Sequence, residues 1–130
     1  MNFISNRFFK IKINNTFSPE YSIETGVPQG GVLSPTLFSI YINDIIFENT
    51  NKKTPIISSL FADDLSSSCS SKSLSQTEKQ LNIYLKKLEG WLIKWRLNLA
   101  PEKCQYIIFS KDTCDKNQNI NIKLFNVNIP

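Results

Sequence analysis

The sequence predicts an α+β fold, in which helices pack on one face of an antiparallel sheet. Short alternating segments, typical of strands, are interspersed with two segments of helical apolar spacing. The order of these elements is two strands, a helix, two strands, a helix and two strands, without the repeated strand–helix–strand unit that favours a parallel sheet. The 130 residues, 41% of them hydrophobic, suffice for one domain with its own core.

The first two strands are expected to form a hairpin over residues 8–25. Residues 8–13 alternate apolar and lysine side chains, as a half-buried strand does. Asn14 and Asn15 favour a turn, and the alternation resumes over residues 21–25. We therefore predict two antiparallel strands joined at the asparagines.

A glycine-rich loop comes next, followed by the first predicted helix. Three of the chain's four glycines lie within residues 26–31. Backbone without Cβ atoms can approach a ligand closely, although a glycine loop before a helix is also common without any ligand. The spacing matches neither a Walker P-loop nor a dinucleotide fingerprint. Pro35 suits the first turn of a helix with Ser34 as its N-cap, and apolar spacing continues to about Phe47. The polar residues 48–55 are expected to be an exposed loop.

Two adjacent aspartates follow an apolar strand. Residues 56–60 lead into Phe61-Ala62-Asp63-Asp64, and residues 65–70 are small and mostly polar. We expect a strand, a tight turn at the two aspartates and a return strand. Most such pairs are simply solvated, but carboxylates at the end of a buried strand are costly unless they are paired or bind a metal. Because Mg²⁺ prefers oxygen ligands and takes few from protein, the pair is a candidate metal site.

The second predicted helix, residues 75–97, has the clearest pattern in the chain. Ser75 and Glu78 form a capping-box pattern at its start, and Pro101 follows its end. Its apolar stripe, at spacings of four and three residues, consists of Leu81, Leu85, Leu88, Leu92 and Trp95. Further strands are expected at residues 106–109 and 120–125, with a charged loop between them.

Composition excludes several kinds of chemistry. Without histidine the chain can form neither a Ser-His triad nor a His-ligated zinc site. Cys69, Cys104 and Cys114 form no CxxC pair, so we expect reduced thiols. A net charge of +4 weakly favours an anionic partner such as nucleic acid. No apolar run is long enough to span a membrane, and no signal-peptide layout is visible, so we expect an intracellular protein.

Taken together and in this order, the motifs resemble the reverse transcriptases of non-LTR, LINE-like or jockey-type retrotransposons. GVPQGGVLSPTLFSIYINDI, from Gly26, is similar to the B motif of that family, and FADD to its C motif, a metal-binding β-hairpin. LEGWLIKWRLNLAPEKCQYIIFSK, from Leu88, resembles the D region with its following strand, and NIKLFNVNIP resembles the start of the strand toward the primer grip. The resemblance covers essentially the whole chain and implies that residues 1–130 are a partial, palm-like reverse transcriptase domain, located in the nucleus or cytoplasm.

The same resemblance implies roles for individual residues. Asp63 would be the principal metal ligand and Asp64 its neighbour, with Mg²⁺ as the cofactor or Mn²⁺ in its place. Lys103 would lie near the triphosphate, although a solvated lysine is an equal alternative. Gly31 stands where many relatives carry serine, so we expect a looser loop and lower activity. The residues that would lie against template or nucleotide are Pro28, Gln29, Gly30, Gly31, Phe61, Ala62 and Lys103.

In the intact family enzyme, the resemblance implies two-metal nucleotidyl transfer from a dNTP to the 3′-hydroxyl of a DNA primer on an RNA template. Family members hold another metal-binding aspartate in an A motif, which would precede residues 8–13, and this sequence contains neither that motif nor fingers or thumb. We therefore expect no primer extension by this chain alone.

Two alternatives remain open from the sequence. One is a catalytically inactive remnant that only folds or binds nucleic acid. The other is a small RNA-binding module, which would present exposed aromatic and basic residues on a sheet face. Phe8, Phe9, Lys10 and Lys12 could supply some of these residues, although the aromatic ones are equally suited to a core.

Overall fold

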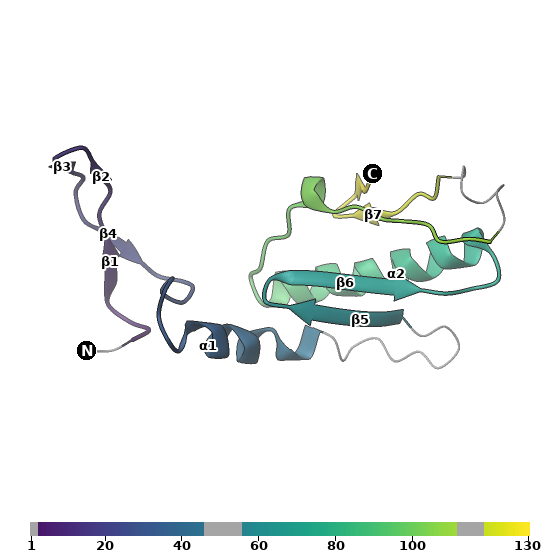
Figure 1. Cartoon of the computed structure of the whole chain (residues 1–130), viewed down its shortest axis with the longest axis horizontal. Helices are drawn as coiled ribbons and strands as arrows, with labels where there is room; N and C mark the ends of the chain where they lie inside the picture. The colour runs from purple at the N-terminus through teal and green to yellow at the C-terminus, as the bar shows by residue number, and fades with distance from the viewer. Residues whose placement is uncertain (1–2, 46–55, 112–118) are drawn as a thin grey trace. The chain divides into compact units, whose positions relative to one another are not determined.

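The computed structural model describes residues 3–45, 56–111 and 119–130, and the chain divides into two compact units, Met1–Asn43 and Asp44–Pro130 (Figure 1). Helices and antiparallel strand pairs are both present, which confirms the α+β class. Within the described ranges the strands form four two-stranded sheets instead of the one sheet that we predicted. None of the helices in those ranges has the length and apolar character needed to cross a membrane.

The N-terminal unit begins with the predicted hairpin, which is built from two short ladders. Its ladders pair β1 (Arg7–Phe9) with β4 (Tyr21–Ile23), and β2 (Lys12–Ile13) with β3 (Thr16–Phe17). Between them the return strand carries one residue more than its partner, as in a β-bulge. There the Ser18 hydroxyl accepts the Ile11 N–H at 2.9 Å. The bulge explains why the continuous strand predicted over residues 8–13 is interrupted.

Helix α1 (Ser34–Tyr41) follows the glycine loop, with Pro35 in its first turn as predicted. The predicted N-cap is wrong, because Ser34 is already helical and Leu33 occupies the capping position without a side-chain hydrogen bond. The Ser34 hydroxyl donates instead to the carbonyl of Pro28. The α-helix ends at Tyr41, earlier than expected, with a 3-10 turn at residues 43–45. Phe47 and the predicted loop at residues 48–55 lie outside the described residues.

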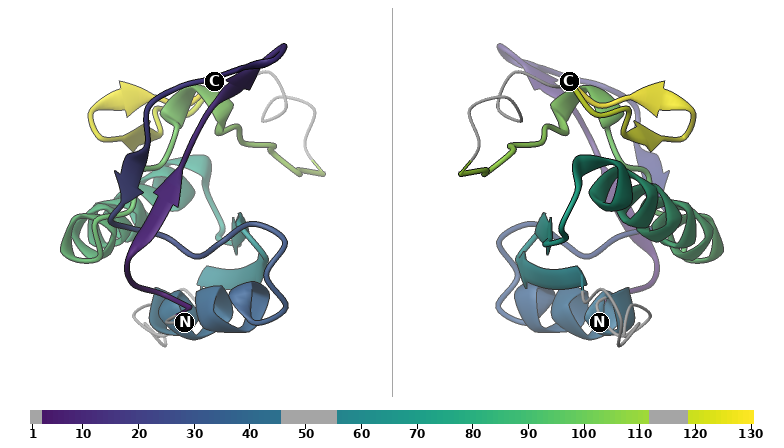
Figure 2. Two further views of the ribbon diagram at one scale, coloured as in Figure 1. Left: turned by 90° about the vertical axis from the view of Figure 1, so that its left-hand side faces the viewer. Right: turned by 90° about the vertical axis from the view of Figure 1, so that its right-hand side faces the viewer.

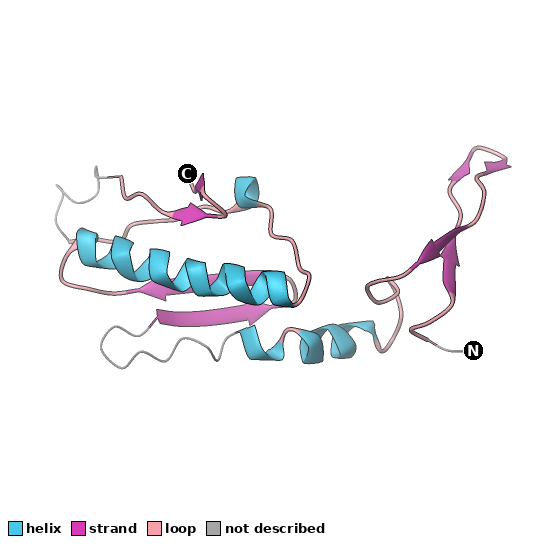
Figure 3. Ribbon diagram, turned by 180° about the vertical axis from the view of Figure 1, so that it is seen from behind, coloured by secondary structure: helices cyan, strands magenta, loops and turns pink. Residues whose placement is uncertain are grey.

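The second unit contains the β-hairpin expected at the aspartates. It consists of β5 (Ile56–Phe61) and β6 (Asp64–Cys69), and Phe61 lies directly opposite Asp64. The two turn residues are therefore Ala62 and Asp63, whereas Asp64 begins β6; the turn is one residue earlier than predicted. Exposure alternates along both strands, so β5 is half-buried and not the buried strand that we assumed. Figure 3 shows the hairpin along one side of α2, which contacts β6.

Helix α2 (Leu74–Lys94) confirms the strongest prediction, but both of its ends differ from it. The N-cap is Ser73 and not Ser75, because the Ser73 hydroxyl accepts the N–H of Gln76 at 3.3 Å. This pairing of Ser73 with Gln76 is itself a capping-box spacing. Of the predicted stripe, Leu88 and Leu92 are buried, and Tyr84 and Trp91 of the same helix complete its contribution to the core.

The C-terminal end of α2 is a Schellman motif without glycine. Leu97 N–H donates to the Leu92 carbonyl at 2.9 Å, and Arg96 N–H donates to that of Ile93 at 3.2 Å. Arg96 takes the left-handed conformation, with φ of 55°. The helix therefore ends three residues before the Leu97 that apolar spacing predicts.

Beyond α2 the chain forms a 3-10 turn, η2 (Pro101–Lys103), and then runs extended. The strand predicted at residues 106–109 joins no ladder in the described structure. The one predicted at residues 120–125 is reduced to β7 (Lys123–Leu124), which pairs with β8 (Val127–Asn128). Positive φ at both turn residues between them, 50° and 62°, is typical of a type I′ hairpin. This hairpin, yellow in Figure 2, contacts α2 through β7. Most of the predicted charged loop, residues 112–118, lies outside the described residues.

Candidate functional site

The tip of the β5–β6 hairpin exposes the two candidate carboxylates. Asp63 is the second turn residue and Asp64 the first residue of β6, and both are exposed. Ala62, the first turn residue, has φ of 52°, a conformation that glycine usually supplies. An L-residue held there costs about 1–2 kcal/mol, and such strain tends to occur at functional sites.

A cluster of three hydroxyls fixes the hairpin to α2. The hydroxyls of Ser58 and Ser67, which are cross-strand partners, lie 2.9 Å apart. Tyr84 from α2, only 2% exposed, places its hydroxyl 2.7 Å from Ser67 Oγ and accepts a hydrogen bond from Ser58 at 3.2 Å. This cluster was not predicted from the sequence, where its only signal is a pair of serines at inward-facing positions that are otherwise apolar.

The carboxylates and the candidate lysine line the same pocket, a cavity of about 560 Å³ in the second unit. Asp63 and Asp64 come from the hairpin, and Lys103 comes from η2. Side chains of the α2 stripe, including Leu81 and Leu85, form the apolar part of its lining. The structure thus places two anions and one cation around one cavity, as a site for a metal–phosphate ligand requires.

The described residues supply part of a metal cage. No group of three or more His, Cys, Asp or Glu side chains that could hold a metal occurs in residues 3–45, 56–111 and 119–130. Two adjacent carboxylates fit Mg²⁺, which commonly takes one or two carboxylates and completes its octahedron with water and substrate phosphates. The chemistry of Asp63 and Asp64 therefore fits this ion as a partial ligand set.

The glycine loop belongs to the N-terminal unit and is described within it. Gly26 and Gly30 have φ of 79° and 75°, and a Cβ on either would meet nothing within 4 Å. These glycines are therefore required by backbone conformation, and the space beside them is open. Arg7 supports the start of the loop by donating to the carbonyls of Thr25 and Gly26. Gln29 is exposed beside Gly30.

Gly31 lies in a closely packed part of the loop. A Cβ there would lie 2.7 Å from Ser34 Oγ and 2.8 Å from a ring atom of Phe3. Its N–H donates to Pro28 at 3.3 Å, and its carbonyl accepts the N–H of Ser34 at 3.1 Å. The missing side chain permits close packing inside a tight turn, and the expected looser loop with lower activity stays a prediction.

Glu89 is a buried charged residue that was not predicted from the sequence. Its Oε1 accepts the Phe125 N–H at 2.6 Å, and its Oε2 accepts a hydrogen bond from Lys86 Nζ at 2.7 Å. Burial raises the pKa of this carboxyl, but the hydrogen bonds from Lys86 and Phe125 and the Lys86 charge outweigh it, so the pKa is lowered. Glu89 thereby ties α2 to the turn between β7 and β8. In the sequence, Glu89 lies one helical turn from both Leu85 and Leu92 of the apolar stripe, which could have indicated its burial.

Cys69 and Cys104 are free thiols, and Cys114 lies outside the described residues. Burial raises the pKa of both, and the Glu102 charge adds to it at Cys104. Neither thiol is therefore activated as a nucleophile.

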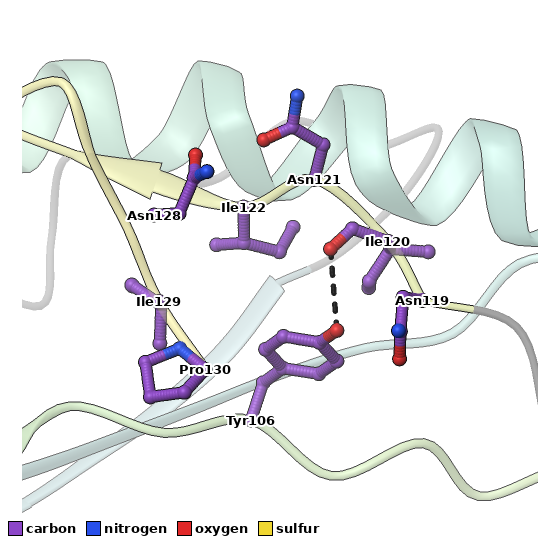
Figure 4. Close-up of a pocket in the computed structure, with 8 residues that line it drawn as sticks. All are labelled: Tyr106, Asn119, Ile120, Asn121, Ile122, Asn128, Ile129 and Pro130. Atoms are coloured by element: carbon purple, nitrogen blue, oxygen red, sulfur yellow. Dashed lines mark hydrogen bonds between the residues drawn. The ribbon is translucent and has the colours of Figure 1, made fainter.

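A second cavity of about 420 Å³ lies at the C-terminal end of the unit (Figure 4). Tyr106 crosses it and donates from its hydroxyl to the carbonyl of Ile120 at 3.2 Å. Asparagine and isoleucine side chains provide most of the remaining lining, without a carboxylate, lysine or arginine. This cavity lacks the charged groups that phosphate or metal binding needs.

Comparison with known proteins agrees with the motifs. Residues 1–123 match the family described as reverse transcriptase (RNA-dependent DNA polymerase). The RNA-directed DNA polymerase from mobile element jockey of Drosophila melanogaster is 29% identical over 114 residues, 85% of this chain. Its counterpart from Drosophila funebris is 31% identical over 113 residues, 83% of the chain. The probable RNA-directed DNA polymerase from transposon BS of Drosophila melanogaster is 30% identical over 104 residues, 78% of the chain.

The chain spans about 12% of the length of each of these relatives. No solved structure matches it significantly.

Proposed function

The chain belongs to the reverse transcriptase (RNA-dependent DNA polymerase) family, and from this premise we propose that it is a palm segment of the RNA-directed DNA polymerase of a non-LTR retrotransposon. The observation that carries the proposal is the shared pocket of Asp63, Asp64 and Lys103. Residues 26–45 would be the B motif, residues 61–64 the C motif and residues 88–111 the D region of a partial domain that extends over residues 1–130.

Asp63 and Asp64 would hold Mg²⁺, or Mn²⁺ in its place. Bound divalent cations supply positive charge to the phosphates and favour deprotonation of the attacking hydroxyl. The strained turn at Ala62 and the anchoring of β5–β6 by Tyr84 hold the carboxylates at the hairpin tip. This arrangement supports Asp63 as the principal ligand and Asp64 as its neighbour.

Lys103 would bind the triphosphate within the same pocket. An ammonium group is a common phosphate ligand, and this one lines the same cavity as the two carboxylates. In the glycine loop, the open space beside Gly30 and the exposed Gln29 support contact with template and nucleotide. Phe61 and Ala62 flank the carboxylates at the hairpin tip and would contact the same ligands, as would Pro28 and Gly31 in the loop.

The reaction would join a primer 3′-hydroxyl to the α-phosphorus of a dNTP and release pyrophosphate, with an RNA template selecting the nucleotide. The oxygen of the primer forms the new bond and the bond to the β-phosphate breaks, so no protein nucleophile is needed. This agrees with a chain that has no histidine and in which the two thiols of the described residues, Cys69 and Cys104, are not activated.

The second candidate function is an inactive remnant that folds or binds nucleic acid. The observation in its favour is the incomplete metal cage in the described residues, where no third acidic, cysteine or histidine ligand joins the pair. Two metals held about 3.5–4 Å apart require more carboxylate ligands than this pair provides.

Primer extension on an RNA template, with Mg²⁺ and with Mn²⁺, tests the proposal. The chain would be compared with its Asp63→Asn variant and with a longer polypeptide that continues upstream through the family's A motif. We expect extension only from the longer polypeptide, abolished by Asp63→Asn and retained by Glu78→Gln, a carboxylate change on α2 outside the pocket. A folded longer polypeptide without activity would favour the remnant.

Direct Mn²⁺ titration of the chain itself, followed by electron paramagnetic resonance, provides a readout that does not depend on turnover. We expect weak binding that Asp63→Asn and Asp64→Asn each reduce, with Glu78→Gln unchanged. Equal binding by all of these variants would overturn the assignment of the metal site.

A further inference from the structure

Asn82, on α2, bonds to the backbone of the C-terminal segment as a neighbouring strand would. Its side-chain Nδ2 donates to the carbonyl of Asn121 at 2.8 Å, and its Oδ1 accepts the N–H of Lys123 at 3.0 Å. A residue of a parallel strand bonds in the same way to the two residues that flank its partner. The amide of Asn82 therefore occupies the position of a strand neighbour opposite Ile122.

Glu89 makes a second contact with the same segment, two helical turns further along α2. Its Oε1 accepts the N–H of Phe125 at 2.6 Å, while its Oε2 accepts a hydrogen bond from Lys86 at 2.7 Å. Residues 121, 123 and 125 alternate along the segment, so the backbone groups that bond to α2 lie on one edge of it. We call Asn82 and Glu89 together the α2 clamp.

The α2 clamp supports a ladder that is too short to fix its own register. The strands β7 and β8 pair over two residues each, and the Ile129 N–H adds a bond to the Ile122 carbonyl at 2.9 Å. A two-stranded hairpin is at best marginally stable alone. Ile122 and Leu124 are 3% and 1% exposed and line the pocket of the two aspartates. A slip of one residue would turn both outward, so the clamp determines which side chains form this part of the pocket.

The clamped segment in turn holds the part of the chain that carries Lys103. Tyr106 lies three residues beyond Lys103 and donates from its hydroxyl to the carbonyl of Ile120 at 3.2 Å (Figure 4). Its N–H donates to the carbonyl of Pro130 at 3.4 Å. The two aspartates lie instead on the β5–β6 hairpin, which the cluster of three hydroxyls fixes to α2 separately. A shift of the clamped segment would therefore displace the lysine and leave the carboxylates in place.

We propose that Asn82 and Glu89 are positioning residues, which hold Lys103 where it can bind a triphosphate. Neither side chain lines the pocket, so both act through the C-terminal hairpin and Tyr106. This role rests on the proposed function, because Lys103 has a triphosphate to bind only there. It extends that function by separating two affinities: the clamp governs nucleotide binding, and the β5–β6 hairpin governs metal binding.

Two titrations of the full chain measure these affinities. Fluorescence anisotropy of a labelled dTTP in excess Mg²⁺ reports the nucleotide, and electron paramagnetic resonance of Mn²⁺ without nucleotide reports the metal. We expect Asn82→Ala and Glu89→Ala each to weaken nucleotide binding by roughly three- to tenfold and to leave Mn²⁺ binding unchanged. Glu89→Gln, whose amide oxygen can still accept the Phe125 N–H, should weaken it less than Glu89→Ala. The matched control is Gln76→Ala, an exposed amide of α2, which should bind both ligands as the unchanged chain does.

A double-mutant cycle tests whether the α2 clamp acts through Lys103. Lys103→Gln removes the cation and should weaken nucleotide binding by roughly tenfold. Adding Asn82→Ala to this variant should cause little further loss, because residues that act through one contact are not additive. Additive losses, or an equal loss of Mn²⁺ affinity in Asn82→Ala, would overturn the positioning role, since both would indicate general destabilisation.

Thiol labelling tests the clamp without any nucleotide. Cys104 follows Lys103 and lines the same pocket, whereas Cys69 lies at the end of β6. Loss of one clamp hydrogen bond should raise the population of the locally open segment, and with it the labelling rate of Cys104, by roughly two- to tenfold. The rate at Cys69, measured in the same sample by peptide mass spectrometry, should stay constant. Unchanged labelling of Cys104 in Asn82→Ala and Glu89→Ala would overturn the positioning role. Faster labelling of Cys104 alone, in a chain that binds no nucleotide, would support the clamp and count against the proposed function.

Discussion

Removal of one hydroxyl tests how the hairpin that carries the aspartates is held. Tyr84→Phe deletes the group that hydrogen-bonds both Ser58 and Ser67 while leaving the ring in place. A net hydrogen bond contributes about 0.5–1.5 kcal/mol, and a polar group left buried without a partner costs about 1–3 kcal/mol. The two serines still lie 2.9 Å from each other, so neither is stranded. We therefore expect a loss of roughly 1–2 kcal/mol in the free energy of unfolding.

The assay is urea unfolding followed by tryptophan fluorescence. Trp91 and Trp95 both lie on or at the end of α2, within the unit that contains the hairpin, so the signal reports the relevant part of the chain. We expect the midpoint to fall while the slope with urea stays constant, since the same surface is exposed on unfolding.

A second set of variants decides whether the loss comes from hydrogen bonding. Replacing all three partners, as Ser58→Ala, Ser67→Ala and Tyr84→Phe together, leaves no unmatched polar group. This triple variant should be less destabilised than the sum of its single changes, because residues of one network do not act additively. A Tyr84→Phe variant as stable as the unchanged chain, or strictly additive losses, would refute the reasoning.

Three further predictions concern single positions. Acidification should destabilise the chain through Glu89, because folding lowers the pKa of its carboxyl. The carboxylate stabilises the fold fully above its ordinary pKa of 4.5. This stabilisation is lost as the pH falls through the lower pKa of the folded state. Glu89→Gln should cost about 1–3 kcal/mol at pH 7 and flatten this pH dependence, measured by urea midpoints between pH 7 and pH 3. Ala62→Gly should raise the melting temperature slightly, because relief of about 1–2 kcal/mol of positive-φ strain exceeds the roughly 0.5–1 kcal/mol entropy cost of glycine. Gly30→Ala should lower the melting temperature, at a cost of about 1–2 kcal/mol, because its φ of 75° disfavours a side chain even in open space.

Controls for these three changes are available in the chain itself. Glu78→Gln removes an acid from the same helix and should leave the acid sensitivity intact. Gly90→Ala, on α2, should stabilise the helix by about 1 kcal/mol, because a Cβ there meets nothing within 4 Å. An unchanged pH profile in Glu89→Gln, a destabilised Ala62→Gly or a stabilised Gly30→Ala would contradict the respective argument.

The parts of the fold that were predictable rest on periodic patterns. The α2 stripe follows from apolar residues repeating every 3.6 residues, and the two hairpins at residues 7–23 and 56–69 follow from alternation every two residues. Helix ends were less predictable, because Ser73 and Ser75 are both good N-caps, and only the backbone decides which serine accepts the amide hydrogen. The end of α2 at Arg96 was not predictable, because Arg96 has the left-handed conformation that glycine usually adopts after a helix.

The hairpin between β7 and β8 was missed for the same reason. Phe125 and Asn126 both have positive φ, and phenylalanine gives no hint of a type I′ turn. Glu89 stabilises this turn by accepting the Phe125 N–H, so a tertiary contact overrides the local preference. Single-sequence patterns cannot show such a contact, because its partners are 36 residues apart.

The candidate site was likewise predictable only in part. The sequence identified Asp63, Asp64 and Lys103 as candidates. It could not show that they line one pocket, because that depends on the tertiary position of η2. The support of the hairpin was invisible, since Ser58, Ser67 and Tyr84 are unremarkable until their hydroxyls meet. If α2 presented a phenylalanine at that point, the two inward-facing serines would keep only their hydrogen bond to each other and would no longer be tied to the helix. Their hydrogen bonds to Tyr84 hold the aspartate-bearing hairpin against α2, as the proposed metal and phosphate site would require.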